Sequence, residues 1–429
     1  MKEKKIPLVF STDENYIFPT GVVISSALQH AKSSTYYIIY IQTTEACKKK
    51  CEQLLSFLEV RYCNYEIIYL LVKEDLFIDN PISNPHVKMP TYYRLIIADQ
   101  IPEWDRCICL DSDILIMDDL SSIYDWKIEE NYIAGVKSWE DQQKNEYNLM
   151  HMKQNGLSSM DSYIYMGVLL MNLKKIREDK LIRQFIMHMS RGYKSDDQDV
   201  FNICCYGKIS FLPLRYNLLI RHYQEKYPEG KHIYSESEIE DAWKNPAILH
   251  FPGRMIKPWE NSRVKFASTW WKMADVFSIT KEYKELKQNL ELNTKHFDWE
   301  YIVNSIPNTK RVIVFGYSNI GKRVLENLLK EGRFEIVGFC DNSPEKKGKR
   351  YGGFSVWELN ELLQQFEKQT LCFIIASQMF AEKIKEQLLE AGIQENNIYI
   401  FYNKDWRYYA SIRENENERK DFNSNCTHI

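Results

Sequence analysis

The stretch 107-CICLDSDILIMDDL-120 places two carboxylates inside an apolar run. The run stops at Asp111, Ser112 and Asp113 and then resumes. Side chains alternate between the two faces of an extended chain, so we expect Asp111 and Asp113 on one face and Ser112 on the other. Two neighbouring carboxylates repel each other unless a positive charge lies between them. A divalent cation supplies that charge, and oxygen ligands suit Mg²⁺ or Mn²⁺.

A plainer interpretation of the pair is that one aspartate caps a turn and the other is solvated. Acidic pairs are common, and Asp118 and Asp119 follow closely without any special meaning. The position favours a site, because ligands of open α/β sheets bind beyond the carboxyl ends of strands. The pair needs support from the rest of the chain.

Composition bounds the class of protein. A chain of 429 residues is too long for one ordinary core, so two or three domains are expected. The hydrophobic content of 44% and aromatic content of 14% are typical of a globular protein. A net charge of −3 gives no positive field to attract nucleic acid, so we expect no nucleic-acid partner.

The cysteines and the N-terminus indicate the compartment. The ten cysteines are scattered and form no C-x-x-C pair, so a zinc site is not expected and reduced thiols fit a reducing compartment. Residues 1–16 lack the apolar core of a signal peptide. No window reaches the roughly 18 apolar residues of a membrane span. We expect a cytoplasmic protein, at most peripheral to the inner face of a membrane.

Residues 1–275 alternate strand-like and helix-like patterns and predict an α/β domain. Pro19 and Thr20 suit the start of a helix. The expected strands are 7–12, 36–43, 65–71, 107–110 and 132–137, and the expected helices include 19–31 and 47–60.

A second α/β pattern follows a Lys/Glu-rich helical connector at 276–307. Residues 308–403 predict a smaller Rossmann-like domain, and residues 404–429 a polar tail. Strands are expected at 371–377 and 397–402, on either side of a helix at 380–392 that ends at Gly392.

The turn 316-GYSNIG-321 in this second domain has the form G-x-S-x-x-G. It follows a strand and opens a helix, and Asp341 ends the next strand, as in a dinucleotide site. Ser318 replaces the glycine that lets a pyrophosphate approach, which weakens the interpretation as an NAD site. Nucleotide binding and a role as an interaction or regulatory module therefore both stay open for this domain.

Support for the carboxylate pair comes from motifs in a fixed order along the first domain. They are 10-FSTDENY-16, 86-HVKMPTYYRL-95, the LDSD stretch, 165-YMGVLLMNLKKIR-177, 197-DQDVFN-202 and 250-HFPGRMIKPW-259. The ordered set resembles glycosyltransferase family 8, over about residues 5–275. The resemblance implies a mixed-sheet nucleotide-diphospho-sugar transferase (GT-A-like) fold. It also implies a retaining, Mn²⁺-dependent hexosyltransferase that uses UDP-glucose or UDP-galactose and acts on a glycan or lipid-linked glycan of the cell surface.

The resemblance assigns roles residue by residue. Asp111, Asp113 and His250 correspond to the metal ligands, with Mn²⁺ favoured and Mg²⁺ an alternative. Arg94, Asp197 and Gln198 correspond to residues beside the reacting sugar. The donor site would be lined by Thr12, Asp13, Asn15, His86, Ser112, Gly253 and Lys257. Taken singly, each also has a plain interpretation as a cap, a loop residue or a core residue.

Two departures from the family pattern bear on function. Tyr165 stands where the family usually has a small polar residue, and an extra residue separates Gly253 from Lys257. Together with Ser318, these departures keep open the alternative of a non-catalytic nucleotide-sugar binding or scaffold protein. A UDP-sugar hydrolase that uses the same metal site is a second alternative. The acceptor is expected at 139–165. The Trp-rich segment 254–277 either touches an anionic membrane or packs into the sheet domain.

Overall fold

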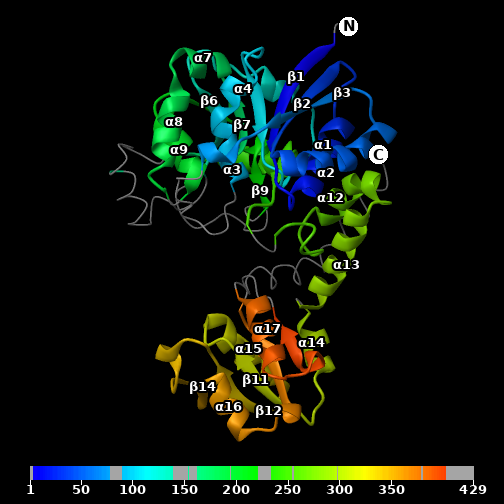
Figure 1. The fold of residues 1–429 in the computed structure, drawn as a ribbon, viewed down its shortest axis with the longest axis vertical. Helices are drawn as coiled ribbons and strands as arrows, with labels where there is room; N and C mark the ends of the chain where they lie inside the picture. The colour runs from blue at the N-terminus through cyan, green and yellow to red at the C-terminus, as the bar shows by residue number, and fades with distance from the viewer. Residues whose placement is uncertain are drawn as a thin grey trace. The chain divides into compact units, whose positions relative to one another are not determined.

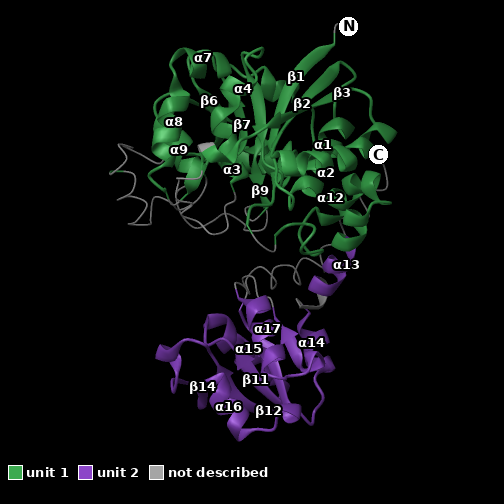
Figure 2. Cartoon of the chain, viewed as in Figure 1, with its two compact units in different colours: residues 1–286 green, residues 287–429 purple. Residues whose placement is uncertain are grey.

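The computed structural model describes residues 3–77, 89–138, 153, 162–193, 195–220, 233–253, 256–296, 298–377 and 380–401. The chain divides into two compact units, residues 1–286 and 287–429 (Figure 2). The boundary falls inside helix α13 (Lys281–His296), within the segment that we expected to be a helical connector.

The first unit is built on a seven-stranded sheet of order β3-β2-β1-β4-β7-β6-β8. Strands β1, β2, β3 and β4 run parallel, whereas β7 is antiparallel to both of its neighbours, so the sheet is mixed. The strands are β1 (Lys4–Ser11), β2 (Thr35–Thr43), β3 (Tyr65–Leu71), β4 (Cys107–Leu110), β6 (Ile133–Lys137), β7 (Ile164–Met171) and β8 (Ile209–Leu212).

A three-stranded sheet lies beside the turn that follows β4. It consists of β5 (Ile114–Ile116), β10 (Ile248–His250) and β9 (Leu218–Leu219), in the order β5-β10-β9. The stretch quoted above therefore does not form one continuous strand. It leaves the large sheet at Leu110 and enters the small sheet at Ile114.

Helices cover the large sheet in two groups (Figure 1). Helices α3 (Pro90–Tyr93), α4 (Ile97–Gln100), α7 (Leu173–Glu178), α8 (Leu181–Met189) and α9 (Asp196–Cys204) share one hydrophobic core with β1, β2, β4 and β7. Helices α1 (Ile17–Gln29), α2 (Glu45–Leu55) and α12 (Ala267–Ala274) form the other group, in which Ser25 Oγ donates to the Met273 carbonyl at 2.9 Å. The described part of the unit also contains helices α5 (Ser121–Tyr124) and α11 (Glu236–Lys244).

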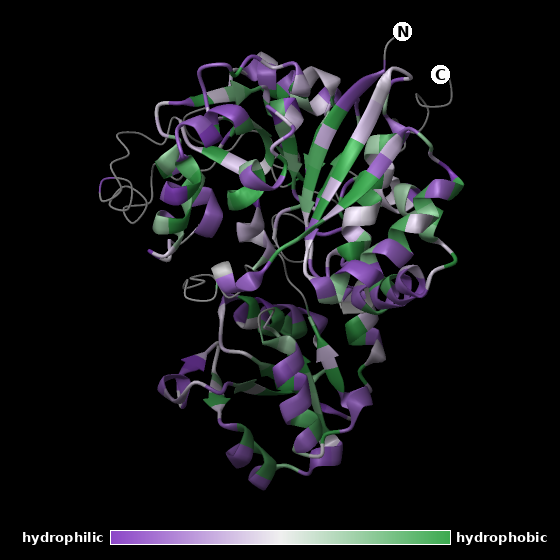
Figure 3. Cartoon of the chain, turned by 45° about the horizontal axis from the view of Figure 1, so that its top comes forward, coloured by the Kyte–Doolittle hydropathy of each residue, from purple (hydrophilic) through white to green (hydrophobic). Residues whose placement is uncertain are grey.

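The pattern of hydrophobicity matches this layering. Figure 3 shows hydrophobic residues concentrated in the strands, whereas the helices alternate between hydrophobic and hydrophilic colour. β4 is buried along its whole length. A strand that is covered on both faces has a continuous run of apolar residues. Asp111 is therefore conspicuous because it directly follows such a run.

Helix α1 begins earlier than the sequence predicted. It starts at Ile17, two residues before Pro19. The reason is the Asp13 carboxylate, whose Oδ1 accepts the backbone N–H groups of Asn15 (3.0 Å) and Tyr16 (3.2 Å) and so folds the chain into a turn before the helix. The helix expected at 47–60 also divides, into α2 and a 3₁₀ turn at Ser56–Val60.

The second unit carries a six-stranded sheet of order β13-β14-β12-β11-β15-β16. Its strands are β11 (Arg311–Phe315), β12 (Glu335–Cys340), β13 (Arg350–Tyr351), β14 (Phe354–Trp357), β15 (Leu371–Ile375) and β16 (Ile398–Ile400). All its pairings except β13 with β14 are parallel. Besides the end of α13, its described residues form the helices α14 (Trp299–Ser305), α15 (Asn319–Glu331), α16 (Leu359–Gln365) and α17 (Ala381–Glu390). Gly392, at φ +85°, follows α17 as the expected C-terminal cap.

Candidate active site

The two carboxylates lie in the turn that connects the large sheet to the small one. The backbone N–H of Asp111 donates to the Gly167 carbonyl (2.9 Å), which fixes the turn to β7. The carbonyl of Asp113 accepts the N–H of Phe251 (2.9 Å), which fixes it to the end of β10. We expected the alternation of side chains along a strand to place both carboxylates on one face. That reason is wrong, because residues 111–113 form a turn between two sheets, and it is this turn that brings the two side chains to one side.

His250 meets the pair from the small sheet. It ends β10 and lies opposite Ile114 in the antiparallel pairing with β5. Its Nε2 is 3.2 Å from Asp113 Oδ1 and 3.7 Å from Asp111 Oδ2. One ligand atom from each of the three residues lies within 4.8 Å of the others. The structure thus brings together the three residues that the sequence proposed as metal ligands.

The geometry and chemistry of this cluster fit a divalent ion. Two ligand atoms that each lie about 2.1 Å from one ion are at most about 4.2 Å apart, and both His250 separations meet that limit. Mg²⁺ takes mainly oxygen ligands, whereas transition ions accept imidazole as well. A site of two carboxylates and one imidazole therefore fits Mn²⁺ better than Mg²⁺.

Asn217 supports His250 from behind and was missed by the sequence argument. Its Oδ1 lies 2.9 Å from His250 Nδ1, and both side chains are buried. Asn217 follows the 3₁₀ turn Leu214–Tyr216 and precedes β9, in a stretch with no motif that marks it.

Gly167 is a second residue whose role was missed. A Cβ atom at this position would lie 2.3 Å from His250 Cε1 and 2.6 Å from His250 Nδ1. It would also lie 3.2 Å from Asp111 Oδ2. Only glycine leaves room for the imidazole against β7. The residue stands inside the quoted YMGVLL motif, but periodicity gives no hint that a histidine packs onto it.

Arg94 holds the carboxylates from the helical side. Its guanidinium donates to the Met166 carbonyl through Nη1 (2.8 Å) and to Asp111 Oδ1 through Nη2. Its Nε lies 3.3 Å from Asp197 Oδ2, which is an ion pair without hydrogen-bond geometry. The side chain is buried. Burial lowers the pKa of Arg94, but the carboxylates of Asp111 and Asp197 outweigh it and raise that pKa. Arg94 therefore stays cationic.

Asp197 lies in the first turn of helix α9 and is almost fully buried. Burial, with added repulsion from Asp111 and Asp196, outweighs Arg94 and raises the pKa of Asp197 to about 7. Its neighbour Gln198 is half-buried, and its Nε2 donates to the Tyr163 hydroxyl at 3.3 Å. Gln198 is thus connected to the carboxylate cluster through its neighbour rather than by a contact of its own.

Helix α9 is tied to β7 by Asn202. The Asn202 side chain accepts the Ile164 N–H (2.8 Å) and donates to the Ile164 carbonyl (3.0 Å), as a neighbouring strand would. Asp196 has a left-handed φ of +47°, and the Tyr92 hydroxyl donates to its Oδ1 (2.8 Å). This strained start to the helix sets where Asp197 and Gln198 point.

Lys257 contacts Asp113 in spite of the extra residue before it. Its Nζ donates to Asp113 Oδ2, and the rings of Tyr16 and Trp259 lie 5.7 Å from the charge. Burial raises the pKa of Asp113, but Lys257 and His250 outweigh burial and hold that pKa well below its usual range. Gly253, the other residue expected here, is exposed, with a left-handed φ of +91°.

The residues at the end of β1 reach the site through hydroxyl groups. Thr20 Oγ1 lies 2.7 Å from Ser112 Oγ and 3.2 Å from Thr12 Oγ1. The Thr12 N–H donates to the Gln42 carbonyl (3.0 Å), so its backbone N–H is engaged within the sheet. Asp13 uses one oxygen to cap its turn, and Asn15 is exposed beside it.

Some expectations lie outside the described residues or take the plainer outcome. His86 and nearly all of the expected acceptor segment before Ser162 fall outside the described residues. Tyr165 is buried in β7. Trp270 and Trp271 are buried, at 0% and 6% exposure, so they pack inside the first unit rather than presenting an aromatic surface.

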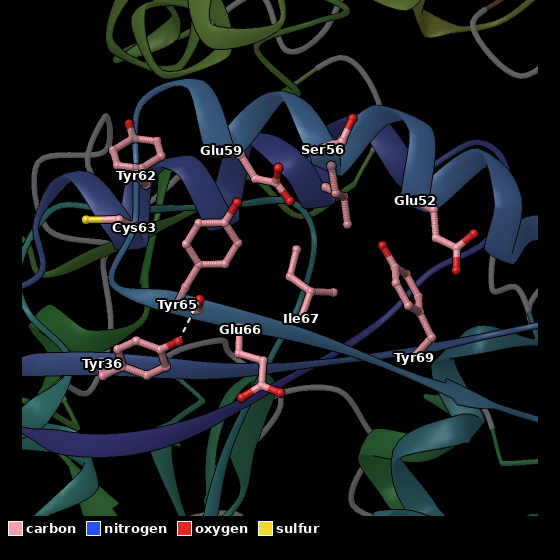
Figure 4. Close-up of a pocket in the computed structure, with 11 residues that line it drawn as sticks. Tyr36, Glu52, Ser56, Glu59, Tyr62, Cys63, Tyr65, Glu66, Ile67 and Tyr69 are labelled. Carbon is pink, nitrogen blue, oxygen red and sulfur yellow. Dashed lines mark hydrogen bonds between the residues drawn. The ribbon is translucent and has the colours of Figure 1, made fainter.

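A cavity in the first unit lies away from this cluster. It is open between β3 and the helical segment from α2 to the following 3₁₀ turn (Figure 4). Tyr65, Ile67 and Tyr69 point into it from β3, opposite Glu52, Ser56 and Glu59. None of the carboxylate-site residues lines it, so it is separate from the site.

Residues of the second unit itself make many of the hydrogen bonds of its glycine turn. Ser318 Oγ accepts the Gly321 N–H (3.2 Å) and caps α15. Asp341 accepts from the Tyr317 N–H (2.7 Å), from the Ser343 N–H (2.9 Å) and from Lys346 Nζ (3.1 Å). The serine that replaces glycine thus serves as a helix cap, and the aspartate holds the turn together.

Comparison with known proteins gives the family. The profile of glycosyl transferase family 8 matches residues 7–263, and one described as C2185-like, N-terminal, matches residues 308–399. A putative glycosyltransferase of Haemophilus influenzae is 28% identical over 49% of this chain, and the match spans 62% of that protein. The lipopolysaccharide 1,3-galactosyltransferase of Salmonella typhimurium is 24% identical, over 68% of this chain and 87% of that protein.

A solved structure supports the fold. The galactosyltransferase LgtC, in complex with donor and acceptor sugar analogs, superposes with a TM-score of 0.53 at 21% identity. The match covers 66% of this chain and all of that one. Within the described part of the chain, no helix combines the length and hydrophobicity needed to cross a bilayer.

Proposed function

This chain belongs to glycosyl transferase family 8, and from that premise we propose that it is a retaining, Mn²⁺-dependent hexosyltransferase. The donor is UDP-glucose or UDP-galactose, and the acceptor is a cell-surface glycan of the lipopolysaccharide or capsule type. The observation that carries the proposal is the convergence of Asp111, Asp113 and His250, whose ligand atoms lie within 4.8 Å of one another.

Asp111, Asp113 and His250 would hold the ion. When bound, such an ion neutralises the diphosphate and stabilises the charge that develops as the bond from sugar to phosphate breaks. Two cations of the chain lie on either side of the cluster, Arg94 beside Asp111 and Lys257 beside Asp113. Both are buried, where a positive charge stabilises developing negative charge more strongly than in water.

Retention of configuration at the sugar carbon requires one of two routes. Either a nucleophile of the enzyme forms an intermediate, or the acceptor attacks from the same face from which the leaving group departs. Asp197 is held beside Arg94, and its raised pKa leaves much of it protonated at neutral pH. The Gln198 amide donates to Tyr163 and is a weak nucleophile. These contacts favour same-face attack, in which the amide oxygen of Gln198 stabilises the positive charge on the sugar and the ionised fraction of Asp197 is an alternative stabiliser.

The test is release of UDP from a panel of UDP-sugars, with Mn²⁺ and with chelator, with and without glycan acceptors. We expect Mn²⁺-dependent release from one hexose donor, faster with acceptor, and lost in Asp113→Asn. Asp118→Asn, in the neighbouring acidic pair, is the matched control and should retain the wild-type rate. Release that is equally fast without acceptor would instead indicate a UDP-sugar hydrolase. UDP binding without turnover would indicate a binding protein.

A further inference from the structure

The imidazole of His250 has a built-in partner on the side away from the carboxylates. Asn217 Oδ1 lies 2.9 Å from Nδ1, while Nε2 faces Asp113 and Asp111 at 3.2 and 3.7 Å. The Asn217 side chain is fully buried. The chemistry of this pairing bears on how His250 acts.

The backbone holds Asn217 at this position. The residue precedes β9, which runs parallel to β10, with Leu219 opposite His250. Its own N–H donates to the Leu214 carbonyl at 3.1 Å, closing the 3₁₀ turn before the strand. The amide is therefore placed by the same small sheet that places the histidine.

The amide oxygen selects one tautomer of the imidazole. A carbonyl oxygen accepts hydrogen bonds and cannot donate them, so the ring proton must be on Nδ1. In the neutral ring, Nε2 then presents its lone pair to Asp113 and Asp111. A lone pair facing two carboxylates is unfavourable unless a cation lies between them, so the arrangement prepares His250 as a ligand rather than as a hydrogen-bond donor.

The other half of the amide shows what this orientation costs. Asn217 Nδ2 is buried and has no hydrogen-bond partner among the residues that the structure describes. Turning the amide around would let Nδ2 donate to Nδ1 and would leave Oδ1 unpaired instead. It would also move the ring proton to Nε2, where it would point at Asp113. The observed orientation therefore forgoes a hydrogen bond from Nε2 to Asp113 and keeps Nε2 free to bind metal.

We propose that Asn217 is a positioning residue that fixes His250 in the Nδ1–H tautomer and thereby sets the affinity of the site for a divalent cation. The proposal rests on the proposed function, because it takes Asp111, Asp113 and His250 as the ligands of that cation.

The test uses three variants of the full chain. Asn217→Leu removes the acceptor, and Asn217→Asp keeps an acceptor oxygen in its place. Asn172→Leu is the matched control, because Asn172 is a helix cap that holds the carbonyls of Ile128, Glu129 and Asn131. Mn²⁺ affinity is measured by electron paramagnetic resonance without substrate. The tautomer is read from ¹⁵N–¹H correlations of labelled protein at a pH where His250 is neutral, assigned by its loss in His250→Gln.

We expect the Nδ1–H tautomer in the wild type and in Asn217→Asp. Mn²⁺ should bind about 10–100-fold more weakly to Asn217→Leu, with Asn217→Asp and Asn172→Leu close to wild type. A wild-type Nε2–H tautomer, or unchanged Mn²⁺ affinity in Asn217→Leu, would overturn the proposal. Should Asn217→Leu not fold, the wild-type tautomer and Asn217→Ala still decide it. A wild type that binds no Mn²⁺ would instead refute the proposed metal dependence.

Discussion

His250 Nε2 lies 3.2 Å from Asp113 Oδ1, and a backbone hydrogen bond also connects the end of the His250 strand to Asp113. The N–H of Phe251, next to His250, donates to the Asp113 carbonyl at 2.9 Å. His250 therefore meets Asp113 through the pairing of β10 with the chain that leads into β5, rather than through a loop. A site placed by strands holds its geometry more closely than one placed by loops, and the predictions below depend on that rigidity.

Gly167→Ala should weaken metal binding strongly. The added Cβ would lie 2.3 Å from His250 Cε1, so the imidazole must leave the position in which it faces the carboxylates. Overpacking of this kind also costs about 1–3 kcal/mol of stability. Mn²⁺ titration of the folded variant, followed by electron paramagnetic resonance, measures the loss.

Gly207→Ala separates the two effects of that substitution. Gly207 has a left-handed φ of +77° and open space where a Cβ would stand, so alanine strains the backbone there without touching the site. It should lower the melting temperature and leave Mn²⁺ affinity unchanged. Equal Mn²⁺ affinities in both variants would show that Gly167 does not position His250.

Asp197 should make the metal-free protein less stable as pH rises. Its pKa is raised from 3.8 to about 7, so between these values the folded chain keeps a proton that the unfolded chain releases. The contribution of the protonated form is present below about pH 4 and is lost as pH rises through about 7, by at most about 4 kcal/mol. Urea unfolding between pH 4.5 and 8 in chelator measures it.

Asp197→Asn isolates this contribution from every other titrating group. The amide keeps the size of the carboxyl group and has no proton to lose. The free energy of unfolding of the wild type should therefore fall relative to that of Asp197→Asn as pH rises from about 4 to about 7. Parallel pH profiles for the two proteins would contradict the burial argument.

Arg94→Lys should reduce kcat, although the charge is kept. The guanidinium contacts the Met166 carbonyl, Asp111 and Asp197 at the same time, and an ammonium group cannot span all three. Loss of one preorganised donor typically costs about 10²–10³ in kcat. Arg177→Lys is the control, because Arg177 bridges the carbonyls of Ala98 and Trp104 away from the site. Similar activities of the two variants would argue against a role for the Arg94 fork.

The second unit should bind no dinucleotide through its glycine turn. Asp341 already accepts the N–H groups of Tyr317 and Ser343, and Ser318 already caps α15. Titration calorimetry of the full chain with NAD should give no heat of binding, and Asp341→Asn should not change UDP binding. Saturable NAD binding that is lost in Asp341→Asn would reverse this conclusion and make the unit a nucleotide-binding domain.

Much of the fold followed from the sequence because the strands are apolar and regularly spaced. The strand expected at 107–110 has those limits in the structure, and the mixed α/β sheet of the first unit is confirmed. The start of α1 was misplaced because the Asp13 turn pulls the helix back to Ile17. The division of the DSD stretch between two sheets has no local signal, since β5 is defined by its partner β10 far along the chain.

The candidate site shows the same division between chemistry and placement. Carboxylate chemistry proposed Asp111 and Asp113, the resemblance to the family proposed His250, and the structure gathers the three. Asn217 and Gly167 act through packing and hydrogen bonding against His250. Their roles depend on which side chain lies opposite them, and a single sequence does not contain that information. The doubt about Lys257 arose from loop spacing, which does not limit the reach of a lysine side chain.

The proposed function requires that Asp111, Asp113 and His250 hold the ion that binds the donor diphosphate. The most direct measurement is anomalous diffraction from crystals grown with Mn²⁺ and UDP. We expect one Mn²⁺ peak coordinated by these three side chains and by phosphate oxygens of UDP. A UDP molecule bound with its diphosphate away from the three residues, or a Mn²⁺ peak on other side chains, would contradict it.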